Sequence, residues 1–226
     1  MRAAAPPVRA ILPRALPPRD TDATAFTGIL ADLIAHIPGA RSAALVDPDG
    51  ESVDYTGKAA PFDVKLAAAQ LRVTFDELRA PVFWREARTL VVRGATKSFL
   101  VQALPDGYAL VVILAKRAGF SASLRALSVC ARALEAEAGL TNDQSWGLWT
   151  RVAVRCDPGW RPVSVSGSKG GASYLVEVLG SVMGLANRDR AFRVRLETGA
   201  EVTLVRERGG IWYSEEPIDF ARRPRA

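Results

Sequence analysis

Residues 37–52 read IPGARSAALVDPDGES, a polar turn set between two runs that favour extended structure. Pro38 and Gly39 end whatever helix precedes them. The run 42–46 is apolar and leads into Asp47-Pro48-Asp49-Gly50, where proline presets one turn residue and glycine permits a positive φ. The run 51–55 then favours a second strand, so the stretch predicts an antiparallel hairpin that follows a helix.

The segment before the hairpin predicts an amphipathic helix that starts at Asp22 or Thr24, either of which can act as the N-cap. Its apolar residues recur at spacings of three and four, which places them on one face. They are Phe26, Ile29, Leu30, Leu33, Ile34 and Ile37.

A second helix is predicted over Pro61 to Arg79, since proline at its start supplies a helix-compatible φ. Its apolar residues fall on two nearly opposite sides and so form two apolar stripes. One stripe contains Phe62, Leu66, Ala69 and Val73, and the other contains Val64, Ala68, Leu71, Phe75 and Leu78. One stripe can cover a sheet of its own subunit. If the other stripe stayed in water, the chain would forgo about 1.5–3 kcal/mol of burial free energy for each large apolar side chain.

We therefore predict a homodimer formed through this helix, since an apolar patch of that size on a soluble chain usually marks an interface. The core and dimer candidates are Phe62, Val64, Leu66, Leu71, Val73, Phe75 and Leu78. Periodicity alone leaves open which stripe faces the partner.

Three strands and a helix are predicted to follow. The strands cover 89–93, 97–104 and 108–114, and the last two flank the turn signature Pro105-Asp106-Gly107. The helix starts near Ser121 or Ser123 and ends at Gly139. The resulting order predicts an α/β sandwich with three helices around a five-stranded antiparallel sheet.

Several local motifs appear in this order: the helix end IPGA, then SAALVDPDGESV, KLAAAQL and FLVQALPDGYALVVIL. Together they resemble the Roadblock/dynein light chain family, including its bacterial MglB-like members, over about residues 24–140. The resemblance implies a longin-like fold and a non-enzymatic dimer. It further implies that the dimer acts as adaptor, scaffold or regulator of a bacterial Ras-like small GTPase, and the regulatory role can include GTPase activation. It does not locate residues that would face the GTPase.

The rest of the chain predicts three further parts: a Pro/Arg-rich arm over 1–22, a linker over 141–150 that follows the Roadblock-like domain of 23–140, and a small β-barrel over 151–220. Residues 221–226 form a basic tail. The arm has a composition that cannot bury a core, and it serves either as a docking peptide or as a leader without a role. Six short strand signals support the barrel. They are 152–155, 162–165, 174–182, 191–197, 201–207 and 211–214.

Residues for catalysis, metal binding or cofactor binding are not expected. His36 is the one histidine, and its place at a helix end suggests an exposed imidazole that interacts with the helix dipole. Cys130 and Cys156 lack the spacing of a zinc site. The stretch SVSGSKGGAS lacks the phosphate-loop spacing and continues into a strand, so it predicts a hairpin turn.

The formal charge is +6 and the pI about 9.7, so a nucleic acid is considered as an alternative partner. The candidates for phosphate contact are Arg193, Arg195, Arg206 and Arg208. Glutamates lie close to them in sequence, which favours an ordinary mixed-charge face and makes nucleic acid an unlikely partner. Neither an export signal nor a membrane-spanning run is evident, and so we expect a cytoplasmic protein that does not insert into membranes.

Overall fold

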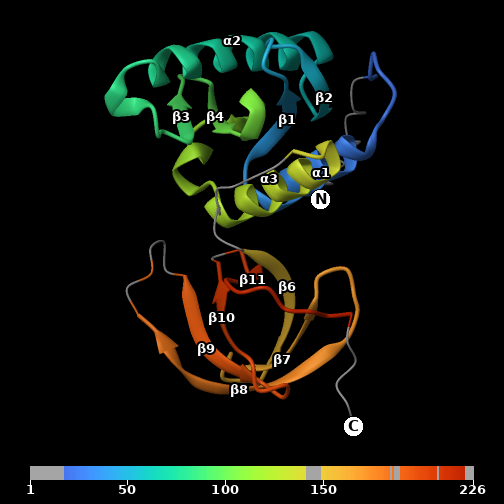
Figure 1. The fold of residues 1–226 in the computed structure, drawn as a ribbon, viewed down its shortest axis with the longest axis vertical. Helices are drawn as coiled ribbons and strands as arrows, with labels where there is room; N and C mark the ends of the chain where they lie inside the picture. Colours follow the sequence, from blue (N-terminus) through green and yellow to red (C-terminus); the bar gives the residue numbers. More distant parts are fainter. Residues whose placement is uncertain (1–17, 141–148, 184, 186–188, 208, 222–226) are drawn as a thin grey trace, which may run out of the picture.

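The computed structural model describes residues 18–140, 149–183, 185, 189–207 and 209–221 (Figure 1). Most of the predicted arm, linker and tail lies outside these ranges. The first part of the chain contains, in order, α1 (Ala25–His36), β1 (Ala40–Val46), β2 (Ser52–Gly57), α2 (Pro61–Arg79), η1 (Val82–Trp84), β3 (Thr89–Arg93), β4 (Lys97–Ala103), η2 (Pro105–Gly107), β5 (Ala109–Ala115), η3 (Ala118–Ser121) and α3 (Leu124–Ala138).

The five strands of this part form one antiparallel sheet in the order β2-β1-β5-β4-β3. The predicted hairpin is β1–β2, with a register shift between Leu45 and Val46. Asp47 holds its turn, because Oδ1 accepts hydrogen bonds from the amides of Asp49 and Glu51 at 3.0 and 2.8 Å. The five-stranded antiparallel sheet with three helices is therefore confirmed.

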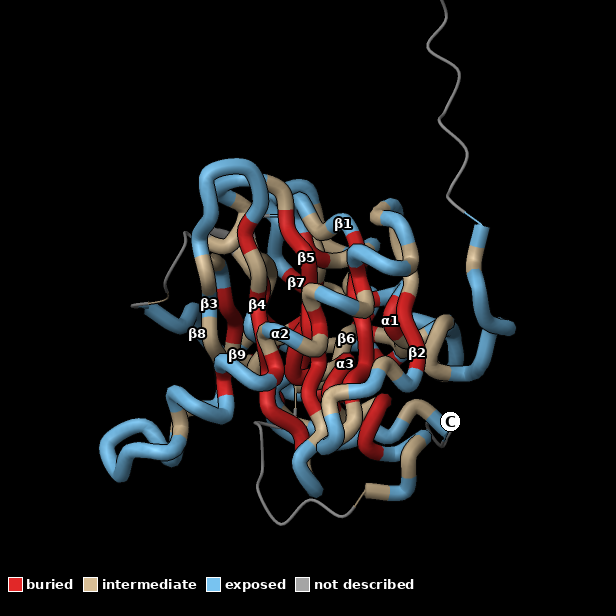
Figure 2. Tube along the Cα trace, turned by 90° about the horizontal axis from the view of Figure 1, so that it is seen from above, coloured by how far each residue is buried: buried red, intermediate tan, exposed pale blue. Residues whose placement is uncertain are grey.

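The sheet has a helical layer on each face (Figure 1). On one face, α2 packs Val64, Ala68 and Phe75 against strand residues such as Val101 and Val111. On the other face, α1 and α3 pack against each other and against residues such as Leu100 and Val112. Figure 2 shows the buried middle strands between these layers.

The second part is a closed antiparallel barrel with the strand order β10-β11-β6-β7-β8-β9, which confirms the small all-β barrel. Its strands begin and end close to the predicted limits. They are β6 (Thr150–Cys156), β7 (Pro162–Gly167), β8 (Ser173–Val182), β9 (Arg190–Leu196), β10 (Glu201–Arg206) and β11 (Trp212–Ser214). The SVSGSKGGAS stretch crosses from β7 to β8, with positive φ at Gly170 and Gly171.

A buried carboxylate, Asp54 of β2, fastens the start of α1 to the sheet. Its side chain accepts hydrogen bonds from the hydroxyls of Thr24 and Thr27 at 2.6 and 2.5 Å, and from the Arg19 guanidinium at 2.5 Å. Burial by itself would raise the pKa of Asp54, but these hydrogen bonds outweigh it and lower that pKa. Thr24 is also the N-cap of α1, as one of the two alternatives from the sequence predicted.

Replacing Asp54 by asparagine (D54N) is expected to lower the free energy of unfolding by about 2 kcal/mol, since it weakens several hydrogen bonds to one buried charge. Because folding lowers the pKa of Asp54, its contribution is complete above the ordinary aspartate pKa of about 4. The contribution is lost as the pH falls through the lowered value.

Urea denaturation of the native chain and D54N at several pH values measures this difference. The exposed turn residue Asp49 supplies the control variant D49N, which should stay within about 0.5 kcal/mol of the native chain. A D54N deficit that is equally large at pH 7 and at pH 2.5 would contradict the role of the charge.

Candidate functional surfaces

The two apolar stripes of α2 differ in solvent exposure. Val64 and Phe75 are buried against the sheet and Leu71 is half-buried. In contrast, Phe62 is 72% exposed, Val73 is 55% exposed and Leu66 is 45% exposed. The outward stripe is therefore Phe62, Leu66 and Val73, which we call the α2 outer face.

Leu78 belongs by periodicity to the sheet-facing stripe, yet it is 45% exposed. Figures 1 and 2 show the reason: the last turn of α2 extends beyond β3, so no strand lies beneath it. The following turn, η1, is also exposed. Its residues Val82, Phe83 and Trp84 carry large apolar side chains, and Phe83 is 95% exposed. The apolar surface therefore continues from the α2 outer face onto η1.

Arg72 holds α2 in this orientation, a role for which the sequence gives no local signal. The side chain is buried, and its Nε and Nη2 donate to the carbonyl oxygen of Gly107 at 3.0 and 2.7 Å. It also pairs with Asp76 one turn later. Because Gly107 lies in the turn between β4 and β5, this contact ties the middle of α2 to the sheet.

The α1–α3 face of the same sheet is covered by the barrel (Figure 1). Tyr213 of β11 is buried in one core cluster with Leu33 of α1 and Leu127 of α3. Burial raises the pKa of Tyr213 to about 12. The sequence gives no local signal for this role of Tyr213, because its partners are remote in the chain.

Two charged groups reinforce this contact between the two parts. Arg125 of α3 pairs with Asp189 at 2.8 Å and with Glu207 at 3.0 Å. The hydroxyl of Ser123, the N-cap of α3, also donates to Glu207 at 2.8 Å. Since these side chains are largely withdrawn from water, removing one partner would leave an uncompensated buried charge.

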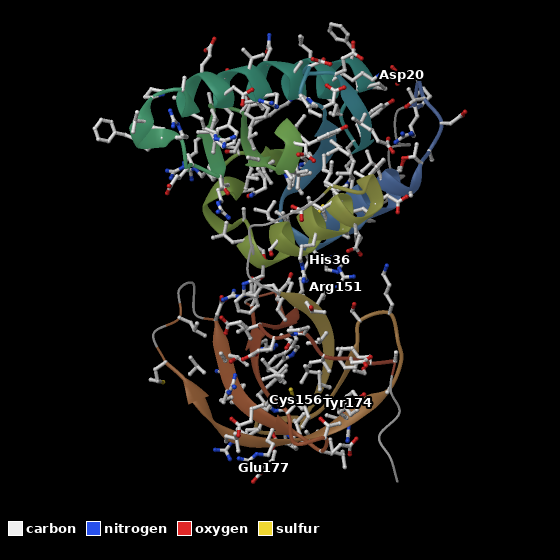
Figure 3. The ribbon with its side chains drawn as sticks, viewed as in Figure 1. Asp20, His36, Arg151, Cys156, Tyr174 and Glu177 are labelled. Carbon is white, nitrogen blue, oxygen red and sulfur yellow. The ribbon has the colours of Figure 1, made fainter. Side chains whose placement is uncertain are left out.

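Arg151 of β6 forms the second group, and Figure 3 shows it next to His36 at the end of α1. Its two terminal nitrogens lie 2.7 and 3.0 Å from the carboxylate oxygens of Asp32. Burial raises the pKa of Asp32, but the hydrogen bond from Arg151 outweighs it and the pKa is lowered. The interpretation of His36 as simply exposed is wrong, because Arg151 brings the barrel against it.

Among the described residues no group of three or more His, Cys, Asp or Glu side chains is arranged to hold a metal ion. Cys130 is buried and Cys156 is half-buried, and burial raises the pKa of both thiols. A hollow of about 690 Å³ lies on the barrel between β6 and β11. Arg206 is on its wall and stacks over the Trp160 ring at 4.5 Å.

Two of the four arginines considered for phosphate contact are engaged with carboxylates. Arg193 pairs with Glu216, and Arg195 lies 3.0 Å from Glu201 and 3.2 Å from Glu177. Arg206 stacks on Trp160, and Arg208 lies outside the described residues. The structure therefore brings Arg193 and Arg195 together on β9 and pairs both with glutamates, which offsets their charge.

Comparison with known proteins gives matches at the level of structure. No protein-family model matches the chain, and no curated protein matches it in sequence. A Roadblock/LC7 domain from Streptomyces avermitilis matches with a TM-score of 0.42 and 18% identity, over 50% of this chain and 97% of that one.

Two Myxococcus xanthus structures match in the same way. MglB gives a TM-score of 0.42 and 20% identity over 52% of this chain and 100% of its own. MglC gives a TM-score of 0.39 and 20% identity over 50% and 99%. Each of the three matches covers about half of this chain.

Replacing Arg125 by methionine (R125M) is expected to cost about 3 kcal/mol, because it leaves Asp189 and Glu207 without their cation. We further expect the single unfolding transition to split, since the barrel would no longer be fastened to α3. Calorimetry measures both effects, with the exposed Arg161 supplying the control variant R161M. One unshifted transition for R125M would show that the pairs do not join the two parts.

Proposed function

We propose that this chain is a non-enzymatic, dimeric adaptor or regulator of a bacterial Ras-like small GTPase. The observation that carries the proposal is the α2 outer face, an apolar helix surface left open while the opposite helical layer is covered by the barrel. The class of partner comes from the Roadblock resemblance of residues 24–140.

A second copy of the chain suits the α2 outer face. Phe62, Leu66 and Val73 make a narrow apolar stripe, and small alanines between them permit close approach of another helix. Edge strand β3 lies on the same side of the domain as the end of α2 and has one unpaired edge in the described sheet. An interface of this kind buries both the apolar stripe and exposed backbone groups.

A regulator of this kind needs no catalytic side chain. It acts by binding one nucleotide-dependent conformation of the GTPase more tightly than the other, and the difference in binding free energy shifts the population. Residues for that contact are not assigned. Stimulated hydrolysis and pure scaffolding both remain forms of this proposal.

The alternative proposal, nucleic-acid binding through the barrel, has less support. The ion pairs of Arg193 and Arg195 with glutamates reduce the counterion release that drives such binding. No helix within the described residues is both long and apolar enough to cross a membrane. A cytoplasmic location is part of the proposal.

Placing charges on the α2 outer face with the double variant L66D/V73D is expected to raise the dimer dissociation constant at least about hundredfold, because two carboxylates would be desolvated in each protomer. Sedimentation velocity at micromolar concentrations measures the change. The matched control is L175D/L179D, which places the same charges on exposed leucines of β8 in the barrel. Equal dissociation constants for both variants and the native chain would refute the assigned interface.

Capture of small GTPases from the same cell, loaded with GTP or GDP on matched resins, tests the partner class. We expect at least about tenfold preference for one nucleotide state, which corresponds to about 1.4 kcal/mol of differential binding. Binding should depend little on salt, whereas a nucleic-acid complex would weaken steeply as salt rises. Failure to bind either loaded form would overturn the regulator proposal.

A further inference from the structure

We propose that residues 11–16 of the Pro/Arg arm dock on the α2 outer face and η1 of their own chain, and thereby compete with dimer formation. The inference deepens the proposed function, because it assigns a regulator to the same apolar face. It begins from contacts that the described end of the arm makes.

The arm is anchored at Arg19 and Asp20, which the sequence included in the free arm. Arg19 bonds to buried Asp54 at 2.5 Å, donates to the carbonyl oxygen of Tyr55 and stacks over the Tyr55 ring at 4.7 Å. Asp20 accepts a hydrogen bond from the Tyr55 hydroxyl and pairs with Lys65 of α2 at 2.9 Å. The hydrogen bond from Lys65, followed by that from Tyr55, lowers the pKa of Asp20.

This anchor lies beside the α2 outer face. Lys65 is three residues after Phe62 and one before Leu66, so it is a surface neighbour of the stripe. Figure 3 shows Asp20 next to the start of α2. The chain that precedes Asp20 therefore starts from the edge of an apolar stripe that is open in the described structure.

If the arm runs back along α2 from Asp20, its length sets which arm residues reach which part of the surface. An extended proline-rich segment advances about 3.1 Å per residue and a helix about 1.5 Å, so each arm residue passes about two helix residues. The count starts at Asp20, which pairs with Lys65. Four arm residues earlier, Leu16 comes level with Val73, and six residues earlier, Arg14 comes level with Glu77. Ile11 and Leu12 come level with η1, where Val82 and Phe83 are exposed.

The chemistry of the two surfaces matches in this register. Leu16 meets an apolar residue, Arg14 meets the exposed carboxylate of Glu77, and two large aliphatic side chains meet an apolar turn. Proline restricts φ, so Pro13, Pro17 and Pro18 reduce the conformational entropy that docking would cost. An arm held here covers Val73, which a second copy also needs.

Cysteine pairs test the docking and its register. In a Cys156→Ser background, Leu16→Cys with Val73→Cys should form an intrachain disulfide under mild oxidation, detected by peptide mapping. Cys130 stays outside the exchange because it is buried and its thiol pKa is raised. The matched control pairs Leu16→Cys with Leu175→Cys, an exposed position on the barrel.

We expect the Val73 pair to link at least about tenfold faster than the Leu175 pair. Equal rates would mean random collision and would overturn the proposal. An interchain disulfide that joins position 16 of one copy to position 73 of another would also overturn it, because the occupant would then be the arm of a second copy.

Dimerisation supplies the second measurement. If the arm covers the face in about two thirds of chains, the triple variant I11D/L12D/L16D lowers the dimer dissociation constant roughly tenfold, since both protomers must be uncovered. The control A3D/A4D/A5D carries the same charges farther from the anchor. If the triple variant leaves the dimer dissociation constant unchanged, the arm proposal is wrong and the dimer proposal stands. If the intrachain disulfide forms in a chain that is monomeric, only the dimer proposal is wrong.

Discussion

The insertion of Tyr213 between α1 and α3 is the contact on which the arrangement of this molecule depends. The ring joins the core of the sheet domain, and Arg125 and Arg151 surround the contact with ion pairs to Asp189, Glu207 and Asp32. The sheet has a helical layer on each face, and the barrel covers the α1–α3 layer. Among the described elements, α2 is the helical layer that the barrel leaves uncovered.

Helix α2 can serve as an open surface because its other side is firmly held. Val64, Ala68 and Phe75 supply the apolar burial, and Arg72 adds a hydrogen-bonded link to the Gly107 carbonyl. The outward apolar residues therefore contribute little to folding of the chain itself. Their cost in water is offset only when another surface covers them.

Elements with clean local signals could be predicted from the sequence. The helix stop and hairpin at 37–52, the double stripe of α2 and the alternating barrel strands each follow from short-range patterns of residue type. The relation between the two parts could not be predicted, because it rests on pairs far apart in the chain. Arg125 and Glu207 are 82 positions apart and Arg151 and Asp32 are 119 apart.

The same limit applies to the anchor of the arm. Asp54 occupies an ordinary strand position, and nothing local shows that it is buried with Arg19, Thr24 and Thr27. His36 illustrates the reverse error, since its helix-end position suggested an exposed ring while Arg151 from the barrel lies against it. Periodicity locates a face, but only the tertiary structure shows what covers it.

The fixed barrel also bears on the choice between regulator and scaffold. The α2 outer face and the barrel lie at opposite ends of the molecule, on either side of the α1–α3 layer (Figure 1). A partner on α2 would therefore not touch the barrel, and a ligand in the hollow beside Trp160 would not touch α2. Because the interface ion pairs and Tyr213 hold the two ends in one orientation, two bound partners would be kept apart at a set distance. Under the proposed function, that geometry favours an adaptor whose two parts hold separate partners over a regulator whose two parts converge on one active site.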